Sequence, residues 1–155
     1  IFFAVNYTHT QSEIEAGPND IVIDPLGQQQ FASVYGLDGS QLQGTPEHIA
    51  NLQFGFETEK SELTMLVGYT SERILIRGTP SGSGVPTVFE DPGVNLDLVF
   101  RHNFQVMGSE MTFGVAGRNL LDEAHEEYQQ TAIGRTEYNT YDRGQTFSVS
   151  LTARY

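Results

Sequence analysis

Alternation of apolar and polar residues recurs along the chain and constrains its fold more than any other feature. In residues 147–155 every second residue is apolar, and the residues between them are Ser, Thr or Arg. Side chains of a β-strand point alternately to the two faces of its sheet, so this pattern predicts a strand with one apolar and one polar face. Helical periodicity is scarce. We expect about six such strands, at 1–10, 50–57, 63–72, 94–104, 111–119 and 146–155.

The connections between these segments alternate between short and long: 15–47 is long, 58–62 short, 77–93 long, 106–110 short and 122–144 long. In an up-and-down sheet this order places all short turns at one end and all long loops at the other. Outer-membrane barrels have short periplasmic turns and long extracellular loops, and their tilted strands need about 9–11 residues. The sequence therefore predicts an all-β fold, an antiparallel transmembrane β-barrel segment in which the strands form a meander.

Composition excludes several classes of protein. The chain has 155 residues, the size of one domain, and a formal net charge of −12, which argues against a nucleic-acid partner and against adsorption to an anionic membrane. It has no cysteine, so it has neither disulfides nor a thiolate metal site. It contains no apolar run near the roughly 18 residues of a transmembrane helix. Because the first residues already have the pattern of a strand interior, we expect a piece of a longer protein, with an engineered or matured terminus as the alternative.

A soluble β-sandwich would show the same alternation, because it buries its apolar faces and solvates the polar ones. A soluble all-β binding module therefore stays open as an alternative. The loop asymmetry and the amphipathic last strand favour the barrel, in which the last strand pairs with the first and no edge remains.

Several stretches together resemble the C-terminal barrel strands of TonB-dependent outer-membrane receptors: PEHIANLQFGFE, GYTSERI, EDPGVNLDLVF, GRNLLDEAHEEY and YDRGQTFSVSLTARY. They follow one another in that family's order, and the resemblance covers nearly the whole chain. The Asn-Leu-Leu-Asp of 119–122 is its most specific element. The last strand resembles the signal read by the outer-membrane assembly machinery, although Ser150 stands where that signal often has Gly. The residues that match the signal are Phe147, Val149, Leu151, Ala153 and Tyr155.

The resemblance implies that residues 1–155 supply the last strands of a roughly 22-stranded barrel, with the plug and the N-terminal strands outside this chain. The implied function is active transport in the bacterial outer membrane, as a multi-pass β-barrel. The nutrient would be a ferric siderophore, another metal chelate, cobalamin or a glycan. Implied partners are the rest of the receptor, the TonB–ExbB–ExbD system acting through the plug, lipid and lipopolysaccharide, and the barrel assembly machinery. We expect no catalysis and no cofactor, but a plug-free barrel acting as an adhesin or enzyme is another alternative.

The polar side chains on alternate strand positions would face the lumen of the barrel, where charges stay hydrated. The residues expected there are Asn51, Gln53, Glu57, Glu72, Asn95, Asp97, Arg101, Arg118 and Arg154. Amphipathic aromatic residues would sit at the membrane interfaces, and the candidates are Tyr7, Tyr69, Phe56, Phe104 and Tyr155. As ligand-binding residues in the lumen or loops we predict Arg73, Arg77, Asp91, Arg101 and Arg118.

Acidic residues concentrate in the long loops, which is consistent with capture of a cationic or metal-bearing ligand, with cation bridges to lipopolysaccharide, or with simple solvation. His125 could ligate a metal with Glu123 or Glu126, but Gln129 breaks the HExxH motif of zinc peptidases, and a loop histidine is the simpler interpretation. The glycine-rich segment 78–84 lacks the Gly-Lys-Ser/Thr ending of a phosphate loop and is interpreted as a flexible loop. We predict no metal ligands and no catalytic residues.

Overall fold

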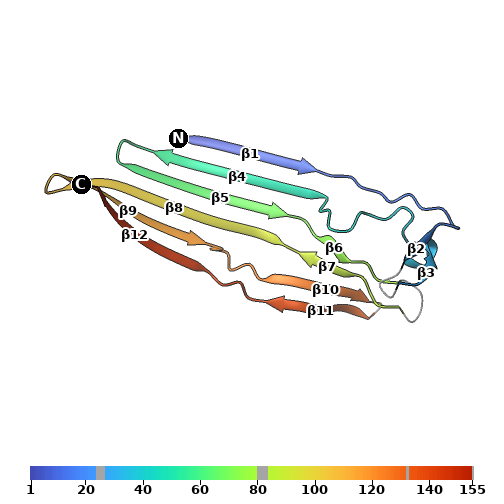
Figure 1. The fold of residues 1–155 in the computed structure, drawn as a ribbon. Helices are drawn as coiled ribbons and strands as arrows, with labels where there is room; N and C mark the ends of the chain where they lie inside the picture. The colour runs from blue at the N-terminus through green and yellow to red at the C-terminus, as the bar shows by residue number, and fades with distance from the viewer. Residues whose placement is uncertain (24–26, 80–83, 132, 155) are drawn as a thin grey trace.

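The long strands form one antiparallel sheet, the main sheet. The computed structural model describes residues 1–23, 27–79, 84–131 and 133–154. The main sheet has six strands in the order β1-β4-β5-β8-β9-β12, which is also their order in the chain, so it is an up-and-down meander (Figure 1). The all-β antiparallel prediction is confirmed. The strands are β1 (Phe2–His9), β4 (His48–Glu57), β5 (Ser61–Thr70), β8 (Gly93–Val106), β9 (Ser109–Arg118) and β12 (Thr146–Arg154).

The long connections carry short strands that the sequence pattern did not predict. Four of these strands form a second sheet, the loop sheet, in the order β11-β10-β7-β6, which prolongs the hairpins of the main sheet (Figure 1). All of them lie at one end of the main sheet, the long-loop end, and the tight turns lie at the opposite, short-turn end. The short elements are β2 (Ile21–Ile23), β3 (Gln29–Phe31), η1 (Ala32–Tyr35), β6 (Arg73–Ile76), β7 (Val88–Asp91), β10 (His125–Thr131) and β11 (Gly134–Tyr141).

The pairing register gathers most apolar side chains of the main sheet on one face, with Phe2, Ile49, Leu66 and Val99 as exceptions. Val5, Leu52, Val67 and Leu96 lie directly opposite one another in a row across four strands. Opposed residues in antiparallel strands point to the same side, so such rows alternate between an apolar face and a polar face. Every Asp, Glu and Arg within the six strands has the parity of the polar face: Glu57, Glu62, Asp97, Arg101, Glu110, Arg118 and Arg154.

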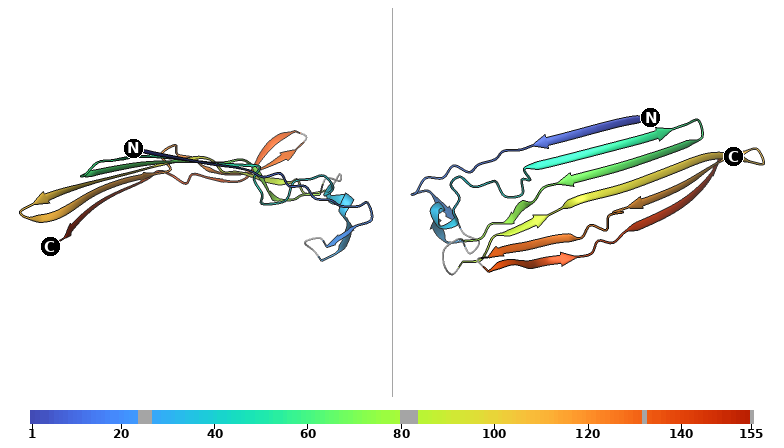
Figure 2. Two further views of the ribbon diagram at one scale, coloured as in Figure 1. Left: turned by 90° about the horizontal axis from the view of Figure 1, so that it is seen from above. Right: turned by 180° about the vertical axis from the view of Figure 1, so that it is seen from behind.

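No layer covers the apolar face in the described part of the chain. Seen from above, the main sheet is a single layer from which the β10–β11 hairpin leans away (Figure 2). Val5 and Val149 on the apolar face are 63% and 72% exposed. The buried hydrophobic residues among those described lie outside the main sheet and are Ala32, Val88 and Tyr128. An uncovered apolar face spanning six strands is a surface that requires lipid or another protein against it.

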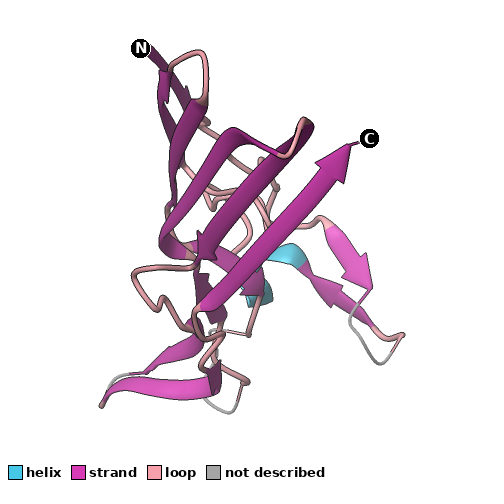
Figure 3. Cartoon of the chain, turned by 90° about the vertical axis from the view of Figure 1, so that its left-hand side faces the viewer, coloured by secondary structure: helices cyan, strands magenta, loops and turns pink. Residues whose placement is uncertain are grey.

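Both edges of the main sheet are open among the described residues. β1 pairs with β4, and β12 pairs with β9, but β1 and β12 do not pair with each other. The view from the short-turn end shows a twisted, curved sheet with these two strands at separate edges (Figure 3). Closure into a barrel is therefore not observed. The unpaired N–H and C=O groups of both edges remain available for a further strand.

The turn between β8 and β9 is as tight as an antiparallel connection can be. Met107 and Gly108 are its only residues, and their φ angles are 51° and 86°. Positive φ at both positions is the type I′ geometry that matches the right-handed twist of paired strands. Gly108 adopts this backbone without steric cost, and the Met107 side chain extends fully into the surroundings. Val106 and Ser109 consequently pair directly, which fixes the register of the whole β8–β9 ladder.

Asn119 joins three strands where β9 ends. Its backbone has a φ of 52°, its Nδ2 donates to the carbonyls of Glu123 (3.1 Å) and Gly144 (3.0 Å), and its Oδ1 accepts from the Glu123 N–H at 2.9 Å. Its own N–H donates to Oδ1 of Asp97 on β8 at 3.0 Å. Asn tolerates the left-handed conformation because its side chain bonds to nearby backbone. Asn119 therefore anchors the start of β12 to β8 and β9.

We predict that Asn119→Ala lowers the free energy of unfolding by about 2–4 kcal/mol, because it leaves backbone groups unpaired and keeps a strained φ without local hydrogen bonds. The measurement is denaturant unfolding of the protein in detergent. The control is Asn139→Ala on exposed β11, which should change stability by less than about 0.5 kcal/mol. Equal effects of the two substitutions would show that Asn119 does not anchor these strands.

Candidate functional site

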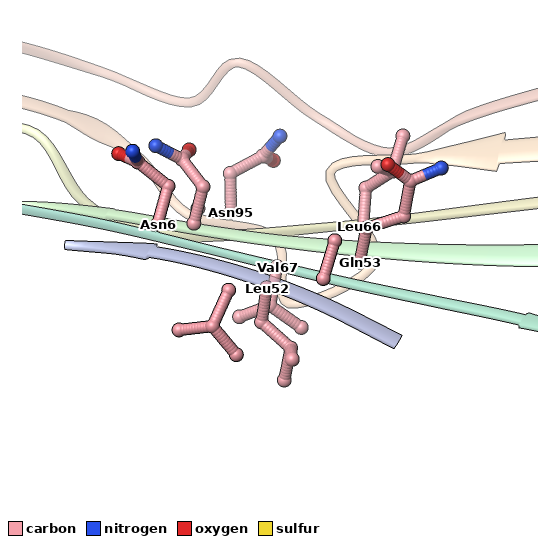
Figure 4. A pocket seen from close by; sticks show the side chains of 10 residues that line it. Asn6, Leu52, Gln53, Leu66, Val67 and Asn95 are labelled. Atoms are coloured by element: carbon pink, nitrogen blue, oxygen red, sulfur yellow. The ribbon is translucent and has the colours of Figure 1, made fainter. Parts of the chain in front are cut away.

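A hollow lined by amide side chains lies over the first four strands of the main sheet. Its volume is about 410 Å³, and Asn6, Asn51, Gln53 and Asn95 contribute its amides. The amides of Asn6, Gln53 and Asn95 point to one side of the sheet, and Leu52 and Val67 point to the other (Figure 4). Amides donate and accept hydrogen bonds without carrying charge. This part of the polar face can therefore bind uncharged polar groups, such as peptide backbone or hydroxyls.

A single glycine leaves the centre of the hollow open. Asn6, Asn51, Gly68 and Asn95 are directly opposed in one row across β1, β4, β5 and β8. Since Gly68 has no side chain, the row has a gap between two amides. A Cβ atom there would lie 3.7 Å from the Asn51 Oδ1, an ordinary contact, so the glycine is not required by packing against that amide. Its effect is to widen the floor of the hollow.

Charges on the polar face are held by neighbours on the same face. Asp97 accepts from the Asn95 Nδ2 at 3.2 Å in addition to its bond with Asn119. Arg101 lies 3.5 Å from a Glu62 oxygen, with both side chains well exposed, so this ion pair contributes little to stability. Asp97 and Arg101 thus have partners on the polar face, and the Arg101–Glu62 pair is open to its surroundings.

The loop sheet contains a partly buried polar cluster built around Tyr128. Tyr128 is only 8% exposed, and its hydroxyl donates to a carboxylate oxygen of Glu72. The Phe89 ring stacks on the Tyr128 ring at 5.6 Å, and the Arg135 guanidinium lies 3.7 Å from its centroid. The cluster thereby joins β7, β10 and β11 to the short link between β5 and β6.

Burial is the main cause that raises the pKa of Tyr128 to about 12, and the hydrogen bond to Glu72 and the negative charge of Glu72 add to it. All three disfavour the phenolate, whereas the positive charge of Arg135 favours it. The Tyr128 hydroxyl is therefore a neutral hydrogen-bond donor at physiological pH. It serves to position the loop sheet and has no acid–base role near neutrality.

In the loop sheet, the strand pairing places acidic residues directly opposite one another. Glu90 lies opposite Glu127, and Asp91 lies opposite Glu126. Like charges in this position destabilise a sheet unless cations compensate them. Arg73 contacts Glu90 at 2.8 Å, His125 contacts Glu127 at 2.7 Å, and Arg135 contacts Glu126. Glu90 and Glu126 are therefore paired with arginines within the loop sheet, and Glu127 is paired with the His125 imidazole.

The predicted ligand-binding residues do not converge on one site. Arg73 is held by Glu90, and the Arg77 Nη2 donates to the Gln41 carbonyl at 2.5 Å, so both stabilise the loops. Burial lowers the pKa of Arg77. Asp91 ends β7, Arg118 ends β9, and Arg101 lies nearer the short-turn end. A binding role for these residues stays a prediction.

Other predicted residues have clear positions. His125 contacts Glu127, not Glu123 or Glu126. Tyr7 and Tyr69 lie on the apolar face near the long-loop end, and Phe56 and Phe104 lie on it near the short-turn end. The matching residues of the last strand also have the parity of the apolar face: Phe147, Val149, Leu151 and Ala153. Tyr155 and the 80–83 part of the glycine-rich loop lie outside the described residues.

Sequence reasoning missed the Tyr128–Glu72 contact because its members are separated by 56 positions. The signal that could have found it is the aromatic ring of Tyr128 in an otherwise polar segment.

Comparison with known protein families, curated proteins and solved structures gives no match to this chain. In the part of the chain that the structure describes, no helix has the length and apolar character needed to cross a membrane.

We predict that Tyr128 ionises only as the pH approaches about 12. Since its folded pKa lies above the ordinary value of 10, its contribution to stability is complete below pH 10 and is lost as the pH rises toward 12. Tyr128→Phe should therefore lose less stability than the wild type between these pH values. Tyrosinate absorbance and thermal unfolding measure both effects. Tyr138→Phe on exposed β11 is the control, and an identical alkaline profile for the two variants would contradict the assignment.

Proposed function

We propose that this chain forms wall and extracellular loops of a bacterial outer-membrane transport receptor of the TonB-dependent kind. One observation carries the proposal: six antiparallel strands present one uncovered apolar face, and their acidic and arginine side chains have the parity of the other. A transmembrane barrel requires this division, because its outer face contacts hydrocarbon and its inner face contacts water.

The two ends of the main sheet support the orientation of the proposed wall. Tight turns occupy one end, and long connections with their own strands occupy the other. Outer-membrane barrels place short turns in the periplasm and long loops outside the cell. Aromatic residues lie near both ends of the apolar face, with Tyr7 and Tyr69 toward the long loops and Phe56 toward the short turns. Such rings are favoured at the interfaces between lipid and water.

The open edges fit a wall segment. Unpaired backbone groups are costly in hydrocarbon, so in a membrane β1 and β12 must pair with further strands. We propose that these strands belong to the rest of a roughly 22-stranded barrel outside this chain. The assembly machinery would fold the whole barrel into the membrane, with the last strand of this chain as its signal.

The polar face and the loops would then have separate tasks. The amide hollow around Asn51 and Asn95 would meet the plug or the hydrated lumen, since it offers neutral donors and acceptors. The long loops, braced by the Tyr128 cluster, would capture the nutrient outside. TonB, driven by ExbB and ExbD, would act on the plug and open a path. The nutrient would be a ferric siderophore, another metal chelate, cobalamin or a glycan.

A pair of adjacent substitutions tests the membrane contact. Met65 has the parity of the apolar face and Leu66 that of the polar face, where Leu66 opposes Asp97 and Gln53. Met65→Arg should cost about 2–4 kcal/mol in a lipid bilayer, because it places a charge in hydrocarbon. Leu66→Arg should cost far less, because Arg remains hydrated and close to Asp97. Unfolding in vesicles measures both, and equal costs would exclude lipid contact at Met65.

A cell experiment tests the transport function. The full-length protein that contains this chain should fractionate with the outer membrane and run on gels with a mobility that changes on heating. Cells that depend on it should take up one of a panel of ferric siderophores, cobalamin and oligosaccharides, and deletion of TonB should abolish that uptake. A monodisperse protein in detergent-free buffer would favour the soluble binding module. Outer-membrane location with no TonB-dependent uptake would favour an adhesin or an enzyme.

A further inference from the structure

His9, Glu47 and His48 form a compact cluster at the long-loop end of the β1–β4 pair. His9 and His48 are directly opposed in the ladder, and their rings stack with centroids 5.1 Å apart. An oxygen of Glu47 lies 3.6 Å from the His48 Nε2 and 4.0 Å from the His9 Nδ1. One potential ligand atom from each residue falls within 4.8 Å of the others. Two segments that are far apart in sequence thus bring three metal-ligating groups together.

We propose that this cluster binds a divalent transition cation of the zinc type. Two imidazole nitrogens and one carboxylate oxygen are a donor set that holds Zn²⁺ in proteins and leaves a fourth position open. Zinc bonds of about 2.0–2.1 Å in a tetrahedron place ligand atoms roughly 3.3 Å apart. The two separations from Glu47, 3.6 and 4.0 Å, exceed that by less than 1 Å, and the two imidazole ligand atoms lie within 4.8 Å of each other. The side chains are 38–56% exposed, so they can close on a cation by rotamer adjustment.

A second observation points to the same use. The Tyr7 hydroxyl lies 2.9 Å from the His48 Nδ1, on the ring nitrogen remote from Glu47. Histidines that bind metals generally donate their other N–H to a neighbouring oxygen, which fixes the tautomer and the ring orientation. In the tautomer whose Nδ1 donates to the Tyr7 oxygen, the Nε2 lone pair is free, and Nε2 is the atom that lies 3.6 Å from Glu47. Tyr7 thus positions His48 to bind a cation together with Glu47.

The backbone holds the third ligand in place. Glu47 immediately precedes β4, so its side chain does not follow the alternation of the strand and can lie beside that of His48. Its carbonyl accepts from the Thr10 N–H at 2.8 Å, which closes the ladder just beyond His9. A bound cation would therefore join β1 to β4 at the base of the long connection between them. The site would act as a brace for that loop, and the net charge of −12 favours any cation.

The test is calorimetric titration of the protein in detergent, purified without a polyhistidine tag and freed of metal with a chelator. Zinc chloride is the probe, and magnesium chloride is the comparison, since Mg²⁺ prefers oxygen ligands. We expect one Zn²⁺ per chain with a dissociation constant in the micromolar range or below, and no binding of Mg²⁺. Absence of zinc binding, or binding only near millimolar concentration, overturns the proposal.

Variants assign the site to these residues. His9→Gln and His48→Gln should each weaken zinc binding at least tenfold, and Tyr7→Phe should weaken it by about tenfold through the orientation of His48. His102→Gln is the matched control, because His102 also lies on the apolar face and is hydrogen-bonded at its Nδ1, to Ser61. It should leave affinity unchanged. The proposal is overturned if His102→Gln and His48→Gln lose zinc affinity equally, or if neither His9→Gln nor His48→Gln changes it. Unchanged gel mobility checks the folding of each variant.

Discussion

The register of the main sheet is the constraint on which the other features depend. Apolar residues alternate with polar ones along each strand, and the pairing aligns them so that Val5, Leu52 and Val67 continue one another across strands. A shift of one residue in any ladder would move the apolar set of that strand to the polar face. Tight turns such as Met107–Gly108 and the hydrogen bonds of Asn119 prevent that shift. The two-faced sheet therefore follows from local turn chemistry together with the alternation.

The ends of the molecule differ in the connections that they carry. At the short-turn end each strand reverses within a few residues, so the connections there carry no strands of their own. At the long-loop end the strands continue into the loop sheet, where opposed acidic residues require cations and where Tyr128 is buried against Phe89 and Arg135. The long connections thus have internal order of their own. Such order is what a surface that receives a ligand needs, because contacts that are already formed do not have to be ordered on binding.

The sequence predicts the main sheet well because its pattern has a single physical cause. Alternation over about ten residues reports a strand with two different faces, and the observed strands lie within the predicted segments or exceed them by a few residues at their ends. The loop sheet was missed because residues 125–141 are mostly polar at both parities, and contacts such as Arg135–Glu126 have no local signature in the sequence. Nothing in the sequence indicates that Arg73 and Arg77 bind partners within the chain, Glu90 and the Gln41 carbonyl, and not a ligand. The His9–Glu47–His48 cluster depends on a register that joins positions 38 or more residues apart, which no local pattern encodes.

The proposed function requires that the apolar face contacts lipid and the polar face contacts water. The chain contains no cysteine, so single cysteines can be placed along β5 and spin-labelled one at a time in the protein reconstituted into vesicles. Collision with oxygen, which concentrates in lipid, should be greatest at Leu63, Met65, Val67 and Tyr69. Collision with a water-soluble nickel chelate should be greatest at Thr64, Leu66, Gly68 and Thr70. Equal access to the nickel chelate at all these positions would contradict the claim.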